Sequence, residues 1–417
     1  MSLSFPERSQ SLLARVEAIR PAIYAISAVV GLGAEPLKAE EYSVEYAVEA
    51  AYSTDDNVTM STGEPDSIYG MNVSLPVTLA MRSERLEAAL TGDFVFSHFD
   101  DDAYDSDDQY LEAITSYRFE NSDLALAANY DRSSTRSTEF LDTGVVGTEA
   151  TRVESLRLGL EFDHAFTPLY GLVSGLEYAD VTYDADIYQD YSFIAGFLGV
   201  TRRQDSRMQL RFQLSGDRYE NKTDSAVTAD SLGLEAGLDY RIANQLAAQL
   251  LVGWAWVGSR YGSGQSGSLE DADENALLLN AGLDYEGERQ SLGFTVESGP
   301  SSSGAGYLRY LRQFGAKYSY HLSKSSSLSL GATLGRSEPV DSHIEGDREY
   351  ARISLGLEHT LTSAWRIAAT YTYSLQEQSD GRDEASVTDE GYLVGRAYSN
   401  AVVLGVTYTS RKATLSR

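Results

Sequence analysis

The chain has 417 residues, with 33 basic and 62 acidic side chains and a formal net charge of −29. A surface this acidic disfavours nucleic acid as a partner, because neutralising phosphates requires basic side chains. The absence of cysteine excludes a disulfide framework, thiol catalysis and cysteine-ligated metal centres, and no apolar run of about 18 residues predicts a transmembrane helix.

The first 39 residues differ from the rest of the chain. Arg8, Arg15 and Arg20 precede an apolar run over residues 22–34, AIYAISAVVGLGA, which ends on small residues. A basic region, a short apolar region and a small-residue cleavage site are typical of a secretory signal peptide. We therefore expect residues 1–39 to be a signal peptide. The alternative interpretation is a buried or amphipathic helix.

From residue 40 onward, apolar side chains alternate with polar or small ones. Residues 42–52 (YSVEYAVEAAY), 71–81 (MNVSLPVTLAM), 156–164 (LRLGLEFDH) and 246–256 (LAAQLLVGWAW) show the pattern. Because side chains in a strand point alternately to its two faces, each run predicts a strand with one apolar face. Most runs span about ten residues, the length that a tilted strand needs to cross a bilayer.

The connections between these runs fall into two classes that alternate along the chain. Short turns such as 82–85, 120–123 and 243–245 alternate with longer, polar and acidic segments such as 53–67 and 376–395. Outer-membrane barrels place short turns on the periplasmic side and long loops outside the cell. The sequence therefore predicts an all-β fold: a single transmembrane antiparallel up-and-down β-barrel of about eighteen strands over residues 40–409. We expect it in the outer membrane of a Gram-negative cell, followed by a C-terminal tail over residues 410–417.

The face opposite the apolar one lines the interior of such a barrel. Its charges form either a mutually satisfied network that keeps the wall wetted or a cation-favouring constriction of the pore. Counting alternate positions along each strand predicts these pore-lining residues: Glu45, Glu49, Glu87, Asp93, Glu112, Arg157, Glu161, Asp163, Arg211, Glu235, Asp239, Arg309, Lys317, Arg352 and Glu358.

Two long loops carry features of their own. Residues 131–152 contain an apolar insert, which either folds into the barrel as a constriction or packs on neighbouring loops. The segment 100–108 is rich in aspartate, and Asp100, Asp102, Asp105 and Asp107 are the candidates for a Ca²⁺ site. They lack the spacing of an EF-hand, so a solvated acidic loop is the preferred interpretation. Such loops can also hold divalent cations that bridge lipopolysaccharide.

No catalytic constellation is recognisable in the sequence. The five histidines are scattered over predicted strands and one loop, and no Ser–His–acid arrangement can be argued from their spacing. We expect a protein that is not an enzyme and that needs no cofactor.

The start of the predicted barrel resembles a group of Gram-negative proteins. Residues 41–61, EYSVEYAVEAAYSTDDNVTMS, contain Tyr52 followed by Asp55, Asp56 and Asn57. This first strand and its turn resemble the β-barrel porin 2 and exopolysaccharide-associated outer-membrane families. The resemblance implies a link to the export of surface polysaccharide. Members usually end on an aromatic residue, whereas here SRKATLSR (410–417) extends beyond Tyr408.

These observations favour an outer-membrane channel. The leading hypothesis is passage or export of a polysaccharide or oligosaccharide through a wide, mildly acidic lumen. The alternatives are a general diffusion porin and a structural or adhesive surface barrel with a blocked lumen. Outer-membrane lipid, lipopolysaccharide and a saccharide or polymer substrate are the expected partners.

Overall fold

The computed structural model describes residues 41–63, 65–135, 151–185, 187–222, 227–261, 272–341, 346–379 and 395–416. The expected signal peptide and residues 136–150 of the loop with the apolar insert lie outside them. The described chain forms twenty strands and one short 3₁₀ helix: β1 (Glu41–Asp55), β2 (Ile68–Ser74), β3 (Val77–Arg82), β4 (Leu86–Phe99), η1 (Asp102–Tyr104), β5 (Ser106–Arg118), β6 (Ser122–Ser134), β7 (Arg152–Ala165), β8 (Tyr170–Tyr183), β9 (Tyr191–Arg203), β10 (Met208–Asn221), β11 (Val227–Ala243), β12 (Leu246–Tyr261), β13 (Ala272–Glu286), β14 (Gln290–Ser301), β15 (Arg309–His321), β16 (Ser326–Pro339), β17 (Asp347–Thr360), β18 (Trp365–Ser379), β19 (Gly395–Thr409) and β20 (Ala413–Ser416).

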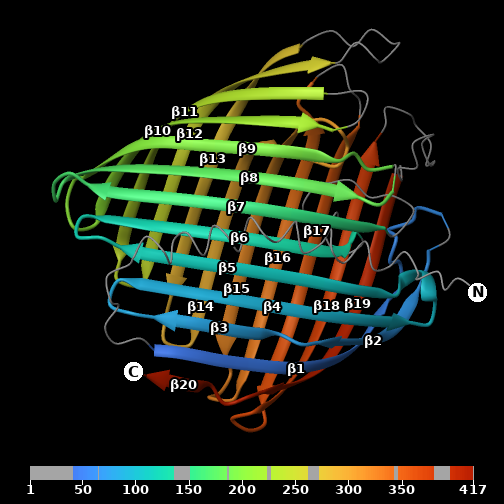
Figure 1. Ribbon diagram of the computed structural model, residues 1–417. Helices are drawn as coiled ribbons and strands as arrows, with labels where there is room; N and C mark the ends of the chain where they lie inside the picture. Colours follow the sequence, from blue (N-terminus) through green and yellow to red (C-terminus); the bar gives the residue numbers. More distant parts are fainter. Residues whose placement is uncertain are drawn as a thin grey trace, which may run out of the picture.

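The strands form one closed antiparallel barrel (Figure 1). From β4 to β19 each strand pairs with the next along the chain, β2 and β3 both pair with β1 and β4, and β1 pairs with β19 from Ala47↔Thr409 to Asp55↔Ala401, which closes the sheet. Two wall positions are each occupied by two consecutive strands, the short β2 and β3 at one and β19 followed by the short β20 at the other, so the barrel has 18 strands. The predicted all-β barrel is confirmed.

The two interruptions have local causes. Pro76 lies between β2 and β3 and has no N–H to donate to the ladder, so the strand breaks while its register with β1 continues. Between β19 and β20 one extra residue forms a bulge, where the backbone N–H of Ser410 donates to the carbonyl of Tyr46 at 2.8 Å. The sheet thus continues to Ser416, through the segment expected to be a tail.

The connections lie at two ends of the barrel according to their length. The turns after β3, β5, β7, β9, β11, β13, β15 and β17 contain two to four residues. Apart from the breaks between β2 and β3 and between β19 and β20, the other connections contain five residues or more, and the strand ends that they join lie together at the opposite end, to the right in Figure 1. We call these the short-turn end and the long-loop end.

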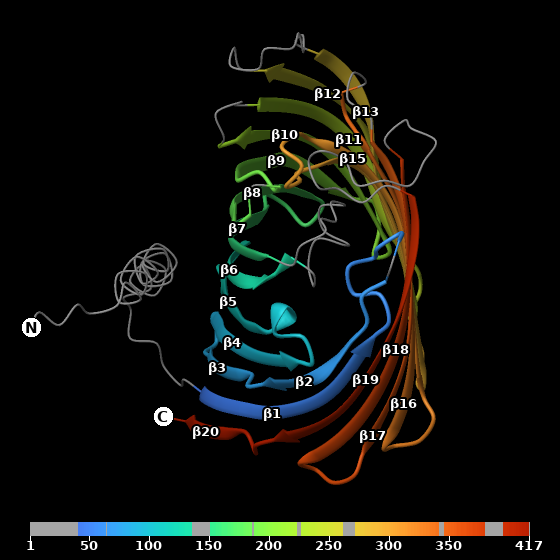
Figure 2. The same cartoon turned by 90° about the vertical axis from the view of Figure 1, so that its right-hand side faces the viewer.

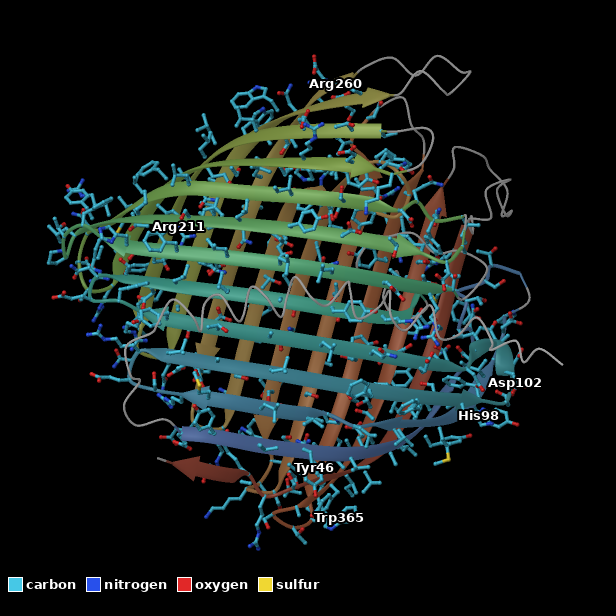
Figure 3. All side chains as sticks on the ribbon, in the orientation of Figure 1. Tyr46, His98, Asp102, Arg211, Arg260 and Trp365 are labelled. Atoms are coloured by element: carbon cyan, nitrogen blue, oxygen red, sulfur yellow. The ribbon has the colours of Figure 1, made fainter. Side chains whose placement is uncertain are left out.

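The outer face of the barrel is apolar. On β12, for example, Leu250, Val252, Trp254 and Trp256 are 43% to 50% exposed, and exposed aliphatic or aromatic side chains occupy the same face of most of the other long strands. Tyr46 and Trp365 lie on this outer surface (Figure 3). A continuous apolar surface of this extent is incompatible with water, so the barrel spans a membrane.

No helix in the described part of the chain is long and apolar enough to span a membrane.

Candidate functional site in the barrel lumen

The inner face of the wall carries the charged side chains that the sequence analysis assigned to the lumen. Directly opposed residues of neighbouring strands share a face, and a cavity inside the barrel is lined by Glu49, Asp93 and Arg352. Following the register around the barrel from these residues places all fifteen candidates on the inner face: Glu45, Glu49, Glu87, Asp93, Glu112, Arg157, Glu161, Asp163, Arg211, Glu235, Asp239, Arg309, Lys317, Arg352 and Glu358. Their role in conduction stays a prediction.

Only some of these charges are paired. Among the residues that the structure describes, Glu112, Arg157, Glu161 and Lys317 make no ion pair and are exposed to the lumen. The pairs that do form are at least one-third exposed, so each contributes little to stability. They are Arg82–Glu87 at 3.1 Å, Arg211–Asp239 at 3.9 Å and Arg366–Glu358 at 3.4 Å.

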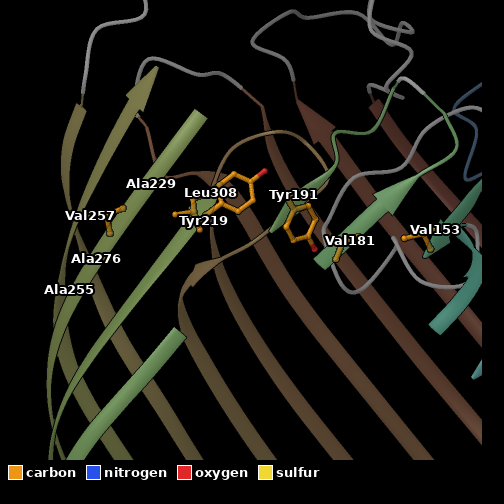
Figure 4. Close-up of a cluster of buried hydrophobic side chains, with 9 residues drawn as sticks. All are labelled: Val153, Val181, Tyr191, Tyr219, Ala229, Ala255, Val257, Ala276 and Leu308. Atoms are coloured by element: carbon orange, nitrogen blue, oxygen red, sulfur yellow. The ribbon is translucent and has the colours of Figure 1, made fainter. Parts of the chain in front are cut away.

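The loop between β14 and β15 (302–308) folds into the lumen at the long-loop end. Its Leu308 is 2% exposed and packs among inner-wall side chains of β7 to β13 (Figure 4). The inner wall is therefore locally apolar, with these residues beneath and beside the loop: Val153, Val181, Tyr191, Tyr219, Ala229, Ala255, Val257 and Ala276.

Hydrogen bonds hold the β14–β15 loop in this position. The buried Tyr219 hydroxyl donates to the carbonyl of Ser303 at 3.1 Å, and the Asn221 amide donates to the carbonyl of Gly306 at 3.3 Å. Gly306 has φ +87°, a conformation that glycine adopts without strain. The loop's backbone also pairs with two other long loops, because the N–H of Gln189 donates to Gly304 and that of Val340 donates to Leu308.

The loop between β1 and β2 (56–67) folds inward against the opposite part of the wall. Met60 is 5% exposed and packs on Tyr350 and Ala397 of the inner face. Its φ of 52° costs about 1–2 kcal/mol for a residue with a side chain. Asn57 holds the turn, since its side chain accepts the N–H of Ser61 at 2.8 Å and donates to the carbonyls of Ser61 and Tyr398. Seen from the long-loop end, this loop and η1 lie within the outline of the barrel (Figure 2).

A cavity of about 540 Å³ lies beside loop 56–67 at the long-loop end, and we call it the mouth cavity. Its lining combines wall residues of β1, β2, β4, β5 and β17 to β19 with residues of loop 56–67 and of other long loops. Most of these residues are polar. Eight bear a serine or threonine hydroxyl, four are acidic and one is basic: Ser53, Thr54, Thr59, Ser74, Ser97, Thr135, Ser374 and Ser399; Glu49, Asp55, Asp93 and Asp108; and Arg352.

A second cluster of polar side chains lies on the rim of the long-loop end, where His98, the last residue but one of β4, lies beside the aspartate-rich loop (Figure 3). Ligand atoms of His98, Asp102 and Asp105 lie within 4.8 Å of one another, which is close enough for the three side chains to hold one metal ion. The His98 ring Nδ1 donates to Asp105 at 2.7 Å. The backbone N–H of Phe99 and then the His98 ring, both donating to it, lower the pKa of the Asp105 carboxyl.

The four aspartates predicted as metal candidates are not brought together. Asp102 and Asp105 belong to the rim cluster, whereas Asp100 accepts the N–H of Tyr69 at 2.9 Å and Asp107 forms ion pairs with Arg132 and Arg152. His98 was not predicted as a metal ligand, although it precedes Asp102 and Asp105 by four and seven residues, a spacing that the sequence shows.

The β14–β15 loop was not predicted to enter the lumen either. A signal existed: in the run over residues 250–257, LLVGWAWV, the inward positions Leu251, Ala255 and Val257 are apolar as well. A strand with two apolar faces indicates that its inner face is also covered.

Comparison with known proteins identifies no relative in sequence. No protein-family model matches the chain, and no curated protein sequence matches it. Among solved structures, OccK2 (OpdF) of Pseudomonas aeruginosa in complex with glucuronate is 12% identical, with a TM-score of 0.45 over 89% of this chain and 98% of that one. OccAB4 of Acinetobacter baumannii is 10% identical, with a TM-score of 0.44 over 90% and 98%. The FrpB iron transporter of Neisseria meningitidis (F5-1 variant) is 8% identical, with a TM-score of 0.48 over 89% and 82%.

Proposed function

We propose that the protein is a channel in the outer membrane of a Gram-negative cell and that hydrophilic solutes, saccharides or oligosaccharides among them, pass through its lumen. The observation that carries the proposal is a polar, partly unpaired inner wall inside a closed barrel with an apolar exterior. Barrels of 16–18 strands typically enclose an aqueous channel rather than a packed core. Unpaired charges such as Glu112, Arg157 and Lys317 remain stable only where water reaches them.

The mouth cavity supports selection by size. Its volume of about 540 Å³ lies within the range of sites that hold one small molecule. Loops 56–67 and 302–308 narrow the lumen at this end, whereas the inner wall toward the short-turn end stays lined by exposed charges such as Glu161 and Asp163. A single saccharide unit, or a chain passing one unit at a time, fits this arrangement better than a bulky polymer.

General diffusion of small solutes is the second candidate, and the unpaired lumen charges favour it. Among the fifteen inner-face candidates, ten are acidic and five are basic. An acidic wall attracts cations and repels anions. We therefore expect both kinds of channel to prefer cations. We also propose that the barrel lies in the outer membrane with lipopolysaccharide around it, and that divalent cations bridge the lipopolysaccharide to the acidic loops.

Planar-bilayer recording of the full chain tests the proposal. We expect stepwise conductance, and a reversal potential in a KCl gradient that shows preference for K⁺ over Cl⁻. Glu161→Gln, on the inner face, should lower this preference. Glu220→Gln, on the outer face of β10, is the matched control and should change it less. A correctly folded barrel that shows no conductance would leave a structural or adhesive role instead. Block by oligosaccharides would favour saccharide passage over general diffusion.

A further inference from the structure

The polar groups of the mouth cavity are suited to a ligand rich in hydroxyl groups. A sugar hydroxyl both donates and accepts hydrogen bonds, so its site needs acceptors and donors side by side. The mouth cavity offers carboxylates, asparagine amides, one guanidinium and several serine and threonine hydroxyls. Three rings supply apolar faces in the same lining: Phe99, Tyr104 and Tyr188.

Two carboxylates in the mouth cavity are held in place through one oxygen each. Asp93 accepts the Ser74 hydroxyl on Oδ1 at 2.6 Å. Asp55 accepts the Ser399 hydroxyl at 2.6 Å and the backbone N–H of Asn57 at 2.9 Å, both on Oδ1. Within the described part of the chain, Oδ2 of Asp55 and Oδ2 of Asp93 accept no hydrogen bond. Each aspartate thus presents an acceptor oxygen that is already oriented before a ligand binds.

The rings are oriented by the loops that carry them. Tyr188 stacks on Tyr183 with ring centres 4.9 Å apart. Tyr104, at the end of η1, donates its hydroxyl to Asp66 at 3.2 Å. Aromatic faces combined with a few placed polar groups are the usual composition of a small-molecule site, and they match the apolar C–H face and polar edge of a sugar ring.

The charge of the lining selects against anionic sugars. Glu49, Asp55, Asp93 and Asp108 face the single cation Arg352. Of these acids, Asp108 is paired with Arg152 at 3.2 Å, and the Arg352 Nε donates to the Ser374 hydroxyl at 3.4 Å. The remaining carboxylates keep the cavity acidic, so a uronate would meet like charge at short range.

We propose that the mouth cavity is a binding site for a neutral saccharide of one or two units, with Asp55 and Asp93 as the hydroxyl-binding acceptors. The inference rests on the proposed channel function, because it assigns that channel its substrate class. Solutes then pause at the mouth before they cross the wider part of the lumen.

Current recordings and calorimetry on the full chain test this site, with maltose and glucuronate as probes. We expect maltose to cause resolvable blockades of the open channel and to bind in detergent solution, and glucuronate to do neither. Asp93→Asn replaces a charged acceptor with a neutral one, and charged hydrogen bonds are roughly twice as strong, so it should raise the Kd for maltose about tenfold. Glu161→Gln is the matched control, since Glu161 lies on the inner face outside the mouth cavity. It should leave the Kd unchanged.

A second variant tests the site independently, in case Asp93→Asn does not fold. Ser97→Trp fills the mouth cavity from β4 and should abolish maltose blockades while the barrel stays folded, as judged by its electrophoretic mobility before and after heating. Equal maltose binding in wild type and Asp93→Asn, or glucuronate binding as tight as that of maltose, overturns the inference. Conductance without maltose blockades refutes the saccharide site but leaves the channel intact. Maltose binding without conductance supports the site and refutes the channel.

Discussion

Removing the hydroxyl of Tyr219 tests most directly whether the β14–β15 loop narrows the lumen. Tyr219 is fully buried, and its hydroxyl donates to the carbonyl of Ser303 in the inward-folded loop at 3.1 Å. Tyr219→Phe keeps the ring packing and leaves that buried carbonyl without its donor. Such a loss costs about 1–3 kcal/mol, and about 1.4 kcal/mol is a tenfold change in an equilibrium. We call the loop seated when it is folded into the lumen and released when it has left this position. We therefore expect the ratio of released to seated molecules to rise about tenfold.

The remaining anchors keep the loop seated most of the time. Leu308 stays buried, a contribution of about 1.5–3 kcal/mol, and its carbonyl still accepts the N–H of Val340 at 3.0 Å. Asn221→Ala removes the second side-chain bond to the loop, at 3.3 Å. The double variant should release the loop more often than either single one, with coupling between the two sites because they hold the same segment.

Single-channel recording measures this equilibrium directly. A released loop widens the mouth, so the variants should spend more time in a level of higher conductance, in the order wild type, single variant, double variant. Tyr371→Phe is the matched control, because it also loses one tyrosine hydroxyl bond, to Asn400 at 2.7 Å, but on the outer face of β18. Identical conductance levels and dwell times in wild type, Tyr219→Phe and the double variant would refute the idea that this loop controls the mouth.

Two further predictions concern the wall and the rim. Leu250→Arg, on the lipid face of β12, should lower the free energy of unfolding in lipid vesicles by about 2–4 kcal/mol. Gln249→Arg, its inward-facing neighbour, should change that free energy by no more than about 0.5 kcal/mol. Equal losses for the two variants in denaturant titrations would contradict the assignment of faces. Because the pKa of Asp105 is lowered in the folded protein, its stabilisation of the rim is present above the ordinary aspartate range and is lost as the pH falls through the lowered pKa. Hydrogen exchange at the Phe99 amide should therefore stay slow from neutral pH to about pH 5 in the wild type. Asp105→Asn should accelerate this exchange over the whole of that pH range. Equal exchange rates in the two proteins would count against this role of Asp105.

The assignment of faces could be predicted from local pattern alone. In residues 246–256, every second side chain is apolar, and a strand in a barrel wall has only two directions in which a side chain can point. One parity choice per strand therefore placed Arg211 and Glu235 on the same inner face without knowledge of any partner strand, and the register between β10 and β11 agrees. The strand count of 18 followed from the same alternation and from the two classes of connection.

The inward position of the loops could not be predicted in this way. Leu308 belongs to a buried cluster with residues from β7 to β13, and the Tyr219–Ser303 bond joins positions 84 residues apart. Met60 accepts a hydrogen bond from Gln376 across 316 residues. Neither contact has a local period, because each depends on which loops meet once the barrel has closed. The rim cluster of His98 with Asp102 and Asp105 depends in the same way on the turn at η1.

The sequence by itself therefore determined the barrel: its strands, its apolar exterior and its charged inner face. These follow from a two-residue period and from the cost of exposing apolar side chains to water, which act on each strand separately. Only the tertiary structure decided the shape of the mouth, the inward position of loops 56–67 and 302–308 and the pairing of β20 with β1. These features depend on contacts between distant segments, and such contacts exist only after the sheet has closed on itself.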